Sequence, residues 1–367
     1  MRVSRLDFRA AIGLRHPIVQ APMAGGATTP DLVAAVSNAG GLGFLAGAML
    51  SPAAIVDNVS RIRALTHRPF GVNLFVLETP RPGEAEVAAA QARLAPAREA
   101  LGLGPASTPA RWCEDTAAQI EALIELAPAV VSFTFGVLDA ETVRRFRRAG
   151  SYVIGTASTV EEARVWTAAG ADAICVQGAE AGAHRGTFLG DFEQSSIGLM
   201  ALIPQVCGAV EVPVIAAGGI MDGRGIAAAL VLGAQATQLG TAFLCCPESG
   251  IHPGWKQAIR QARDDGTRMT RVFSGKYARG IVNSFMEAMR PLEQEIPDYP
   301  VQNALTGDMR RAAAQQGRMD YMSLWAGQGA PMARTLPAAE LVATLADELD
   351  AAVRSLPGLQ STTGETQ

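Results

Sequence analysis

Several residue patterns that mark common enzyme classes are missing from this chain. Its five cysteines form no CxxC pair, and no group of histidine, cysteine and acidic residues has the spacing of a metal site. No GxSxG sequence occurs, so nothing indicates the nucleophile elbow of a serine hydrolase. No GxGxxG sequence follows the first apolar run either, so a Rossmann dinucleotide site is unsupported.

Excess charge and long apolar runs are scarce as well. The 31 Lys and Arg residues against 35 Asp and Glu residues give a net charge of −4, so we expect no nucleic-acid partner. No apolar run approaches about 18 residues, so we expect no membrane partner. The first residues lack the apolar core of a signal peptide, and an odd number of cysteines without a disulfide framework predicts a cytoplasmic protein.

Aromatic residues make up only 5% of the 367 residues, whereas glycine occurs 38 times. This composition indicates many tight turns rather than an aromatic-rich β-sandwich. Hydrophobic residues reach 49%, which excludes a disordered chain and is enough for a large core.

Short apolar runs alternate with alanine-rich helical patterns along the first two thirds of the chain, and they predict eight strands. The predicted strands are His16–Met23, Gly41–Gly47, Phe70–Val76, Ala129–Gly136, Ser151–Ser158, Ala173–Gly178, Pro213–Gly219 and Ala236–Phe243. Most of their starts lie 22–29 residues apart, about the length of one strand and one crossover helix. Near-continuous apolar runs are typical of parallel strands that are covered on both faces.

Eight such units predict a (β/α)8 TIM barrel, an α/β fold, over residues 1–245. A doubly wound open sheet is the less favoured alternative. Residues 77–128 form an insertion after the third strand, with helices expected near 84–101 and 114–126. Residues 246–367 are expected to form a helical extension that packs over the top of the barrel and brings Trp325 to the active site.

Active sites of such barrels lie at the carboxyl ends of the strands, and this rule selects candidate residues. The candidates are Asn73, Gln177, Glu180, His184, Arg185, Gly218, Gly219, Gln238, Gly240 and Thr241. Glycines after the seventh and eighth strands allow backbone N–H groups to approach a phosphate. We therefore expect a phosphate-bearing ligand there.

His184 is the candidate catalytic residue. Of the four histidines, His16 and His67 are expected at the opposite end of the barrel, and His252 lies beyond its last strand. His184 alone is predicted on a loop at the active end, between glycines. No metal ligand is predicted.

Five motifs in order resemble the nitronate monooxygenases, formerly called 2-nitropropane dioxygenases. They are QAPMAGG at 20–26, GVNLFV at 71–76, GAEAGAHRG at 178–186, IAAGGI at 215–220 and QLGTAF at 238–243. The resemblance extends over roughly residues 14–335 and includes YMSLWAGQGAPMAR at 321–334. One departure is Ala183, where the family pattern has glycine, and its extra methyl group is expected to stiffen the loop.

The resemblance implies an FMN-dependent TIM barrel that oxidises alkyl nitronates, such as propionate 3-nitronate, with O2 to an aldehyde or oxo acid plus nitrite. It implies a monomer or homodimer. It assigns FMN contacts to Ala21, Pro22, Met23, Asn73, Gln177, Gly182, Gly218, Gly219, Gln238, Leu239, Gly240 and Thr241. His184 would act on the substrate, either as a cation that binds the nitronate, which we favour at this point, or as a base that deprotonates a nitroalkane. Arg185, Tyr299, Tyr321 and Trp325 are further candidates to line the site.

Two other functions remain open from the sequence. One is an NAD(P)H-dependent flavin reductase of quinones or enoyl thioesters, because related barrels share the EAG-x-H loop. The other is a non-redox enzyme that binds a sugar phosphate, although no lysine at a strand end supports a Schiff-base aldolase.

Overall fold

The computed structural model describes residues 7–355, and eight parallel strands form its centre. They are β1 (Ile18–Gln20), β2 (Gly43–Ala46), β3 (Phe70–Phe75), β4 (Val130–Thr134), β5 (Tyr152–Ala157), β6 (Ala173–Gln177), β8 (Val214–Ala217) and β9 (Ala236–Leu239). Their order is β1-β9-β8-β6-β5-β4-β3-β2, and a parallel bridge between Val19 and Leu42 joins the two ends. The predicted TIM barrel is confirmed, and the alternative of an open sheet is wrong.

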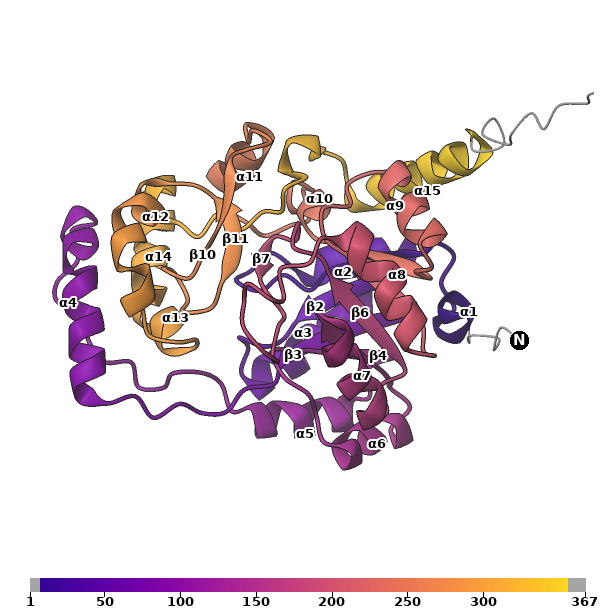
Figure 1. Cartoon of the computed structure of the whole chain (residues 1–367), viewed down its shortest axis with the longest axis horizontal. Coiled ribbons are helices and arrows are strands. Elements are labelled where there is room, and N and C mark those ends of the chain that lie inside the picture. Colours follow the sequence, from indigo (N-terminus) through magenta and orange to yellow (C-terminus); the bar gives the residue numbers. More distant parts are fainter. Residues whose placement is uncertain (1–6, 356–367) are drawn as a thin grey trace, which may run out of the picture.

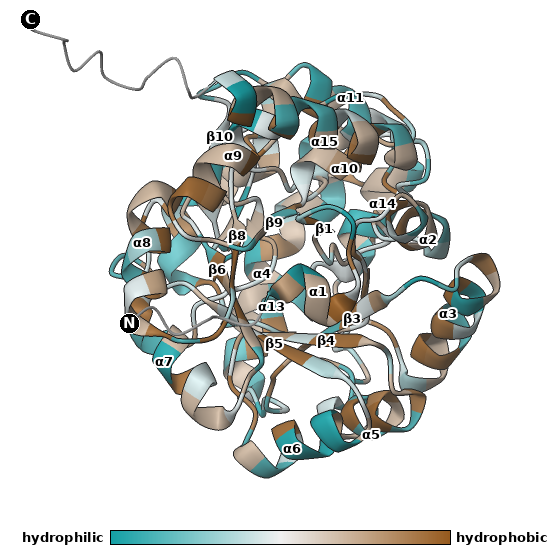
Figure 2. Ribbon diagram, turned by 90° about the vertical axis from the view of Figure 1, so that its right-hand side faces the viewer, coloured by the Kyte–Doolittle hydropathy of each residue, from teal (hydrophilic) through white to brown (hydrophobic). Residues whose placement is uncertain are grey.

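The interior of the barrel is apolar and plugged at its amino end. Helix α1 (Phe8–Ile12) carries the fully buried Phe8, which packs in one cluster with Val19, Phe44 and Ile215 from the strands. Cys175 belongs to the same cluster. Helix α1 lies across the end of the barrel opposite to the loops that carry the candidate site residues (Figure 2).

Helices surround the strands (Figure 2). They are α2 (Pro30–Asn38), α3 (Pro52–Leu65), α5 (Thr116–Leu126), α6 (Ala140–Arg148), α7 (Val160–Ala169), α8 (Leu199–Ala209) and α9 (Gly223–Val231). Helices α2 and α3 begin where the sequence has a capping residue followed by proline. Thr29 and Ser51 cap α2 and α3 with their hydroxyl groups, and a proline follows each cap at the first helical position. The largest hydrophobic cluster lies between these helices and the outer faces of the strands.

The insertion after β3 is divided between two parts of the molecule. Helix α5 packs beside α3 on the barrel, but α4 (Glu84–Ala100) leaves it and joins the C-terminal segments (Figure 1). Leu94 of α4 shares a hydrophobic cluster with Phe273 and Met309, and Arg98 pairs with Asp308 at 2.8 Å. We call α4 and residues 246–335 the cap, because together they build one layer with its own core.

The C-terminal segments differ from the predicted helical extension in two respects. The cap contains α11 (Pro253–Arg260), α12 (Ser284–Met289), α13 (Val301–Leu305) and α14 (Gly307–Gln315), but also strands β10 (Thr267–Thr270) and β11 (Ala278–Ile281). These strands pair antiparallel, and β11 also pairs with β7 (Ala183–His184). The last helix, α15 (Ala338–Ser355), does not cover the barrel top, because it packs against α9 and α2 on the barrel wall.

The predicted boundaries at residues 1 and 367 lie outside the described residues. Within residues 7–355, no helix combines the length and the apolar character that a membrane crossing requires.

Candidate functional site

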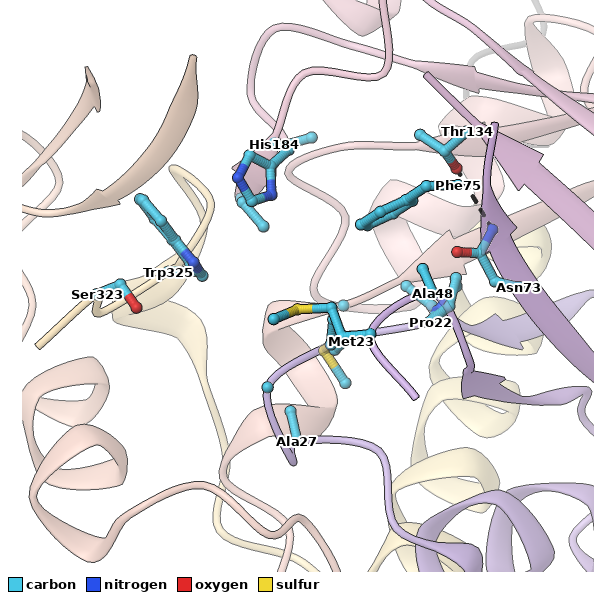
Figure 3. A pocket seen from close by; sticks show the side chains of 18 of the residues that line it. Pro22, Met23, Ala27, Ala48, Asn73, Phe75, Thr134, His184, Ser323 and Trp325 are labelled. Carbon is cyan, nitrogen blue, oxygen red and sulfur yellow. Dashed lines mark hydrogen bonds between the residues drawn. The ribbon is translucent and has the colours of Figure 1, made fainter. Parts of the chain in front are cut away.

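One cavity of about 750 Å³ lies between the carboxyl ends of the barrel strands and the cap. The barrel contributes Ala21, Pro22, Met23, Asn73, Gln177, Gly218, Gly219, Gln238, Gly240 and Thr241, and the loop after β6 contributes Gly182, Ala183 and His184. The cap contributes Tyr299, Asn303, Arg310 and Trp325. Figure 3 shows His184 and Trp325 on one side of the cavity, with Met23 and Phe75 on the other.

Glycines after β8 and β9 present unpaired backbone donors to this cavity. Gly218 and Gly219 have φ angles of 132° and 67°, a region that L residues with a side chain rarely adopt. No acceptor within residues 7–355 pairs with the N–H groups of Gly219 and Gly240. Because backbone N–H groups are strong donors that require a partner, these two can hold an anionic oxygen.

The three neutral amide side chains on the barrel wall differ in how many of their hydrogen-bonding groups remain unpaired. The side chain of Gln238 makes no hydrogen bond to a described residue, so its whole amide group is available to a ligand. The Nδ2 group of Asn73 donates to Ser132 Oγ at 2.9 Å. Gln177 is already used at both ends, because Nε2 donates to the His184 carbonyl at 2.9 Å and Oε1 accepts from Gly186 N at 2.7 Å. Gln177 therefore first of all positions the loop that carries His184.

Two buried charges hold the loop after β6 in place. Arg185 is 1% exposed and donates to the carbonyl oxygens of Gly178, Gln177 and Ser195 at 2.6–3.0 Å. Glu162 on α7 is fully buried and accepts from the Thr187 hydroxyl and from the N–H groups of residues 188 and 189 at 2.6–2.9 Å. Arg185 does not line the cavity, so the expectation that it belongs to the site wall is wrong.

Gly182 and Ala183 show why this loop has its particular sequence. A Cβ atom on Gly182 would lie 2.5 Å from Gly327 N, so the contact that excludes a side chain is one with the cap. Ala183 has a φ of 60°, in the left-handed region that favours glycine. The family pattern with glycine at 183 thus has a direct backbone cause, and the alanine here carries strain next to the candidate catalytic residue.

His184 is neutral in this environment. Burial, together with the positive charges of Lys276 and Arg310, lowers its pKa to about 3. Its Nε2 lies 2.8 Å from Ser274 Oγ, and that hydroxyl donates to the Lys276 carbonyl at 3.1 Å. A hydroxyl has one proton, so this pattern favours a proton on Nε2 and leaves Nδ1 as an acceptor. No residue between 7 and 355 hydrogen-bonds to Nδ1.

Aromatic rings enclose His184 on several sides. The ring of Trp325 lies 5.6 Å from it, that of Tyr299 5.5 Å and that of Phe135 5.7 Å, measured between centroids. Phe75 is 4.2 Å from Phe135 and continues this wall towards the barrel. Apolar rings on these sides of the imidazole disfavour its charged form.

Four basic side chains lie around the loop after β6, together with the carboxylates of Glu162 and Glu180. Burial lowers the pKa of Arg185 and Arg310 to about 10 each, so both remain cations at neutral pH, and burial also lowers the pKa of Lys276 and Arg279. Lys276 donates to the Thr187 carbonyl at 2.8 Å and lies over the Phe135 ring. None of these four forms an ion pair with a carboxylate within residues 7–355. Of these four, Arg310 lines the cavity, where its charge attracts anionic ligands.

Three expectations differ from the structure, and three residues were missed. Leu239 is buried between the strands and the surrounding helices and does not line the cavity, Tyr321 packs against Phe285 away from it, and Arg185, as described above, is the third. Trp325 lies at the site as expected. No sequence pattern marks Ser274, Asn303 or Arg310, because their positions depend on how the cap folds back over the barrel.

The comparisons with known proteins agree with this architecture. The family model described as nitronate monooxygenase matches residues 8–348. A probable nitronate monooxygenase of Bacillus subtilis is 45% identical over 324 residues, which cover 88% of this chain and 92% of the relative. A nitroalkane oxidase from Streptomyces ansochromogenes superposes with a TM-score of 0.87 at 45% identity, covering 94% of this chain and 98% of that one. FabK from Thermotoga maritima follows with a TM-score of 0.76 at 29% identity, over 97% and 100% of the two chains. The resemblance drawn from the five motifs is confirmed, and the chain belongs to the nitronate monooxygenase family.

Proposed function

We propose that this chain binds FMN without a covalent bond and uses it to oxidise alkyl nitronates with O2 to an aldehyde or oxo acid plus nitrite. The observation that carries the proposal is a neutral histidine that shares one cavity with free backbone donors. His184 lines the same cavity as the unpaired N–H groups of Gly219 and Gly240.

The residues of the barrel wall fit FMN. The N–H groups of Gly219 and Gly240 would hold the phosphate oxygens. The free amide of Gln238 would pair with a carbonyl or nitrogen of the flavin, because a neutral amide donates and accepts without titrating. Bound FMN would supply the redox step between nitronate and O2.

The protein contributes orientation and a proton acceptor. With Nε2–H donated to Ser274, Nδ1 of His184 can take the proton from the carbon next to the nitro group, which produces the nitronate in the site. The lowered pKa of His184 disfavours its role as a permanent cation, the role favoured from the sequence alone. The cationic surroundings take over that task, since they stabilise the nitronate once its charge has formed.

The state of the cysteines bears on the cellular compartment. All five cysteines are free in the structure, which suits a reducing compartment, and we propose the cytoplasm.

Two assays on the purified yellow protein test this function. Aerobic nitrite release from alkyl nitronates, without NADH, is the expected result. Flavin released by heat should run with FMN in chromatography. NADH oxidation in the absence of nitronate would instead support the flavin reductase, and release of FAD or of no flavin would overturn the cofactor assignment.

A further inference from the structure

Two polar side chains on one segment of the cap face the cavity side by side. Ser323 and Trp325 line the cavity and are half-buried, whereas the alternate residues Met322 and Leu324 are buried in the core of the cap. Successive residues of an extended segment point to opposite sides, so Ser323 and Trp325 point to the same side. Figure 3 shows both of them on the side of the cavity where His184 lies.

The hydroxyl of Ser323 and the indole N–H of Trp325 are both available to a ligand. No group within residues 7–355 is hydrogen-bonded to Ser323 Oγ or to Trp325 Nε1. The indole nitrogens of Trp166 and Trp255 are unpaired too, but they are buried, whereas that of Trp325 is open to the cavity. A hydroxyl and an indole N–H are neutral donors that do not titrate near neutral pH.

Strand β11 holds Trp325 beside His184. Its residue Ala278 pairs with His184. Two residues further along, Gly280 forms an antiparallel bridge with Trp325. Residues two apart in a strand point to the same face, so the two side chains lie on one face of this sheet, with their rings 5.6 Å apart. A Cβ atom on Gly280 would lie 2.9 Å from the Trp325 ring, so the glycine allows the ring to lie close to the strand.

Proton transfer to His184 creates negative charge close to these donors. When Nδ1 takes the proton from the carbon next to the nitro group, the electron pair of the C–H bond forms a C=N double bond and the negative charge moves to the nitro oxygens. The nitro group is bonded directly to the carbon that faces the imidazole, so this charge develops beside His184. Donors that are already oriented stabilise such a charge, because they need no rearrangement during the step.

Resting on the proposed function, we propose that Ser323 Oγ–H and Trp325 Nε1–H are catalytic groups that donate to the nitro oxygens of the substrate and hold its α-carbon at Nδ1 of His184. Because both donors are neutral, they accept the uncharged nitroalkane. They bind the nitronate more tightly, since a hydrogen bond to an ionised acceptor is roughly twice as strong. This difference lowers the barrier to proton transfer.

Substitutions that remove one donor at a time test the assignment kinetically. Ser323→Ala and Trp325→Phe should each lower kcat for nitroethane about 10²-fold, the usual effect of one lost oxyanion donor, and raise KM by less than about tenfold. The isotope effect of 1,1-dideuterated nitroethane on kcat should rise, because proton transfer becomes the slow step. Ser323→Thr retains a hydroxyl and should retain most of the activity. Trp255→Phe removes a buried indole N–H and is the control, expected to change neither value.

A nitro compound that cannot react separates this assignment from the proposed function. 2-Methyl-2-nitropropane has no proton on the carbon next to its nitro group, so the protein can bind it but cannot deprotonate it. Isothermal titration calorimetry on the purified yellow protein should show its affinity reduced by roughly 2- to 10-fold in Ser323→Ala and in Trp325→Phe. The affinity of Trp255→Phe should equal that of wild type.

The combined results decide the question. If Trp325→Phe lowers kcat but binds 2-methyl-2-nitropropane as wild type does, the indole only positions His184, and the proposal is overturned. Unchanged kinetics in both variants, or no binding of this compound by wild type, overturns it too. If wild type oxidises neither nitroalkanes nor nitronates, the proposed function fails, and the affinities for 2-methyl-2-nitropropane still decide whether Ser323 and Trp325 bind a nitro group.

Discussion

The barrel wall of the cavity is built from strand ends, glycines and neutral amides, whereas the cap wall is built from aromatic rings and cations. Gly218, Gly219 and Gln238 come from adjacent strands, β8 and β9. Tyr299, Arg310 and Trp325 come from segments that reach the site only because the cap folds back. Under the proposed function the two walls have different tasks: the barrel wall would hold the cofactor, and the cap wall would bind the substrate.

His184 lies where the two walls meet. The loop that carries His184 follows β6 of the barrel. Within this loop, Ala183 and His184 form β7, which pairs with β11 of the cap. The buried Glu162 and Arg185 fix the loop from the barrel side, and Ser274 fixes the imidazole from the cap side. A shift of the cap would therefore change the orientation of the His184 imidazole without moving the glycines and amides of the barrel wall.

The largest effect is expected from substitution of His184, the proposed base where the two walls meet. His184→Asn should lower kcat/KM for neutral nitroalkanes about 10²- to 10⁴-fold, the usual range for a general base, and leave turnover of preformed nitronates within about tenfold. Steady-state nitrite release on both substrate forms measures the two values. His67→Asn, an exposed histidine at the other end of the barrel, serves as control. Equal losses on both forms would contradict the role as base.

The lowered pKa of His184 also has consequences for pH dependence. Because its pKa is about 3, wild-type activity should show no protonation step near pH 6.5 that His184→Asn abolishes. In stability, the unfolded chain takes up a proton below about pH 6.5 that the folded chain takes up only near 3. Wild type should therefore lose more unfolding free energy than His184→Asn as pH falls through this window. Chemical denaturation at several pH values measures the difference.

A negative charge added to the barrel wall is expected to weaken cofactor binding while the protein still folds. Gly219→Asp would add a carboxylate beside the proposed phosphate, and two unit charges 4 Å apart repel by about 4 kcal/mol at the effective dielectric near a protein surface. FMN affinity should fall by roughly 10²- to 10³-fold, measured by flavin titration of the apoprotein. Gly219→Ala has the same backbone strain at φ 67° without the charge, so it should lose much less. Equal losses in both variants would show that strain alone explains the effect.

The buried carboxylate of Glu162, on the barrel side of the loop, should contribute mainly to the free energy of unfolding. Glu162→Gln keeps the shape but replaces one acceptor oxygen of the carboxylate with a donor group, next to the N–H groups and the hydroxyl that it holds. We expect the free energy of unfolding to fall by about 2–3 kcal/mol, measured in urea. Glu161→Gln, its exposed neighbour, should change it by less than about 0.5 kcal/mol. A similar small change in both variants would show that Glu162 does not hold the loop.

The smallest effect concerns the strained residue beside the base. Ala183→Gly removes a Cβ atom at φ 60° and should raise the free energy of unfolding by about 0.5–1 kcal/mol. Ala127→Gly at φ 44° lies outside the cavity lining and should give a similar gain with unchanged kinetics. Thermal unfolding compares the two. A loss of stability in Ala183→Gly would show that the loop tolerates the methyl group without strain.

The barrel wall could be predicted from the sequence because its geometry is local. A strand of a TIM barrel always delivers its carboxyl end to the same rim, so Asn73, Gln177 and Gly219 could be assigned to one site from their order alone. The expectation failed for Leu239 because successive residues of a strand point to opposite faces, and its side chain packs in the core. Whether Gln177 binds the loop or a ligand also depended on side-chain geometry that spacing does not contain.

The cap wall could not be predicted in the same way. Strands β10 and β11 are only four residues each and contain arginine and glycine, so no alternating apolar pattern marks them. Helix α4 joins the cap through long-range contacts such as Arg98 with Asp308, 210 residues away in sequence. The donors that we assign to the substrate depend on such contacts, and a single sequence does not show which of them remain unpaired.

The most direct test of the account is anaerobic mixing of the yellow protein with an alkyl nitronate while flavin absorbance is followed. The account predicts that the nitronate bleaches the flavin within the turnover time, whereas NADH leaves it oxidised. Rapid bleaching by NADH, with no change on addition of the nitronate, would contradict it.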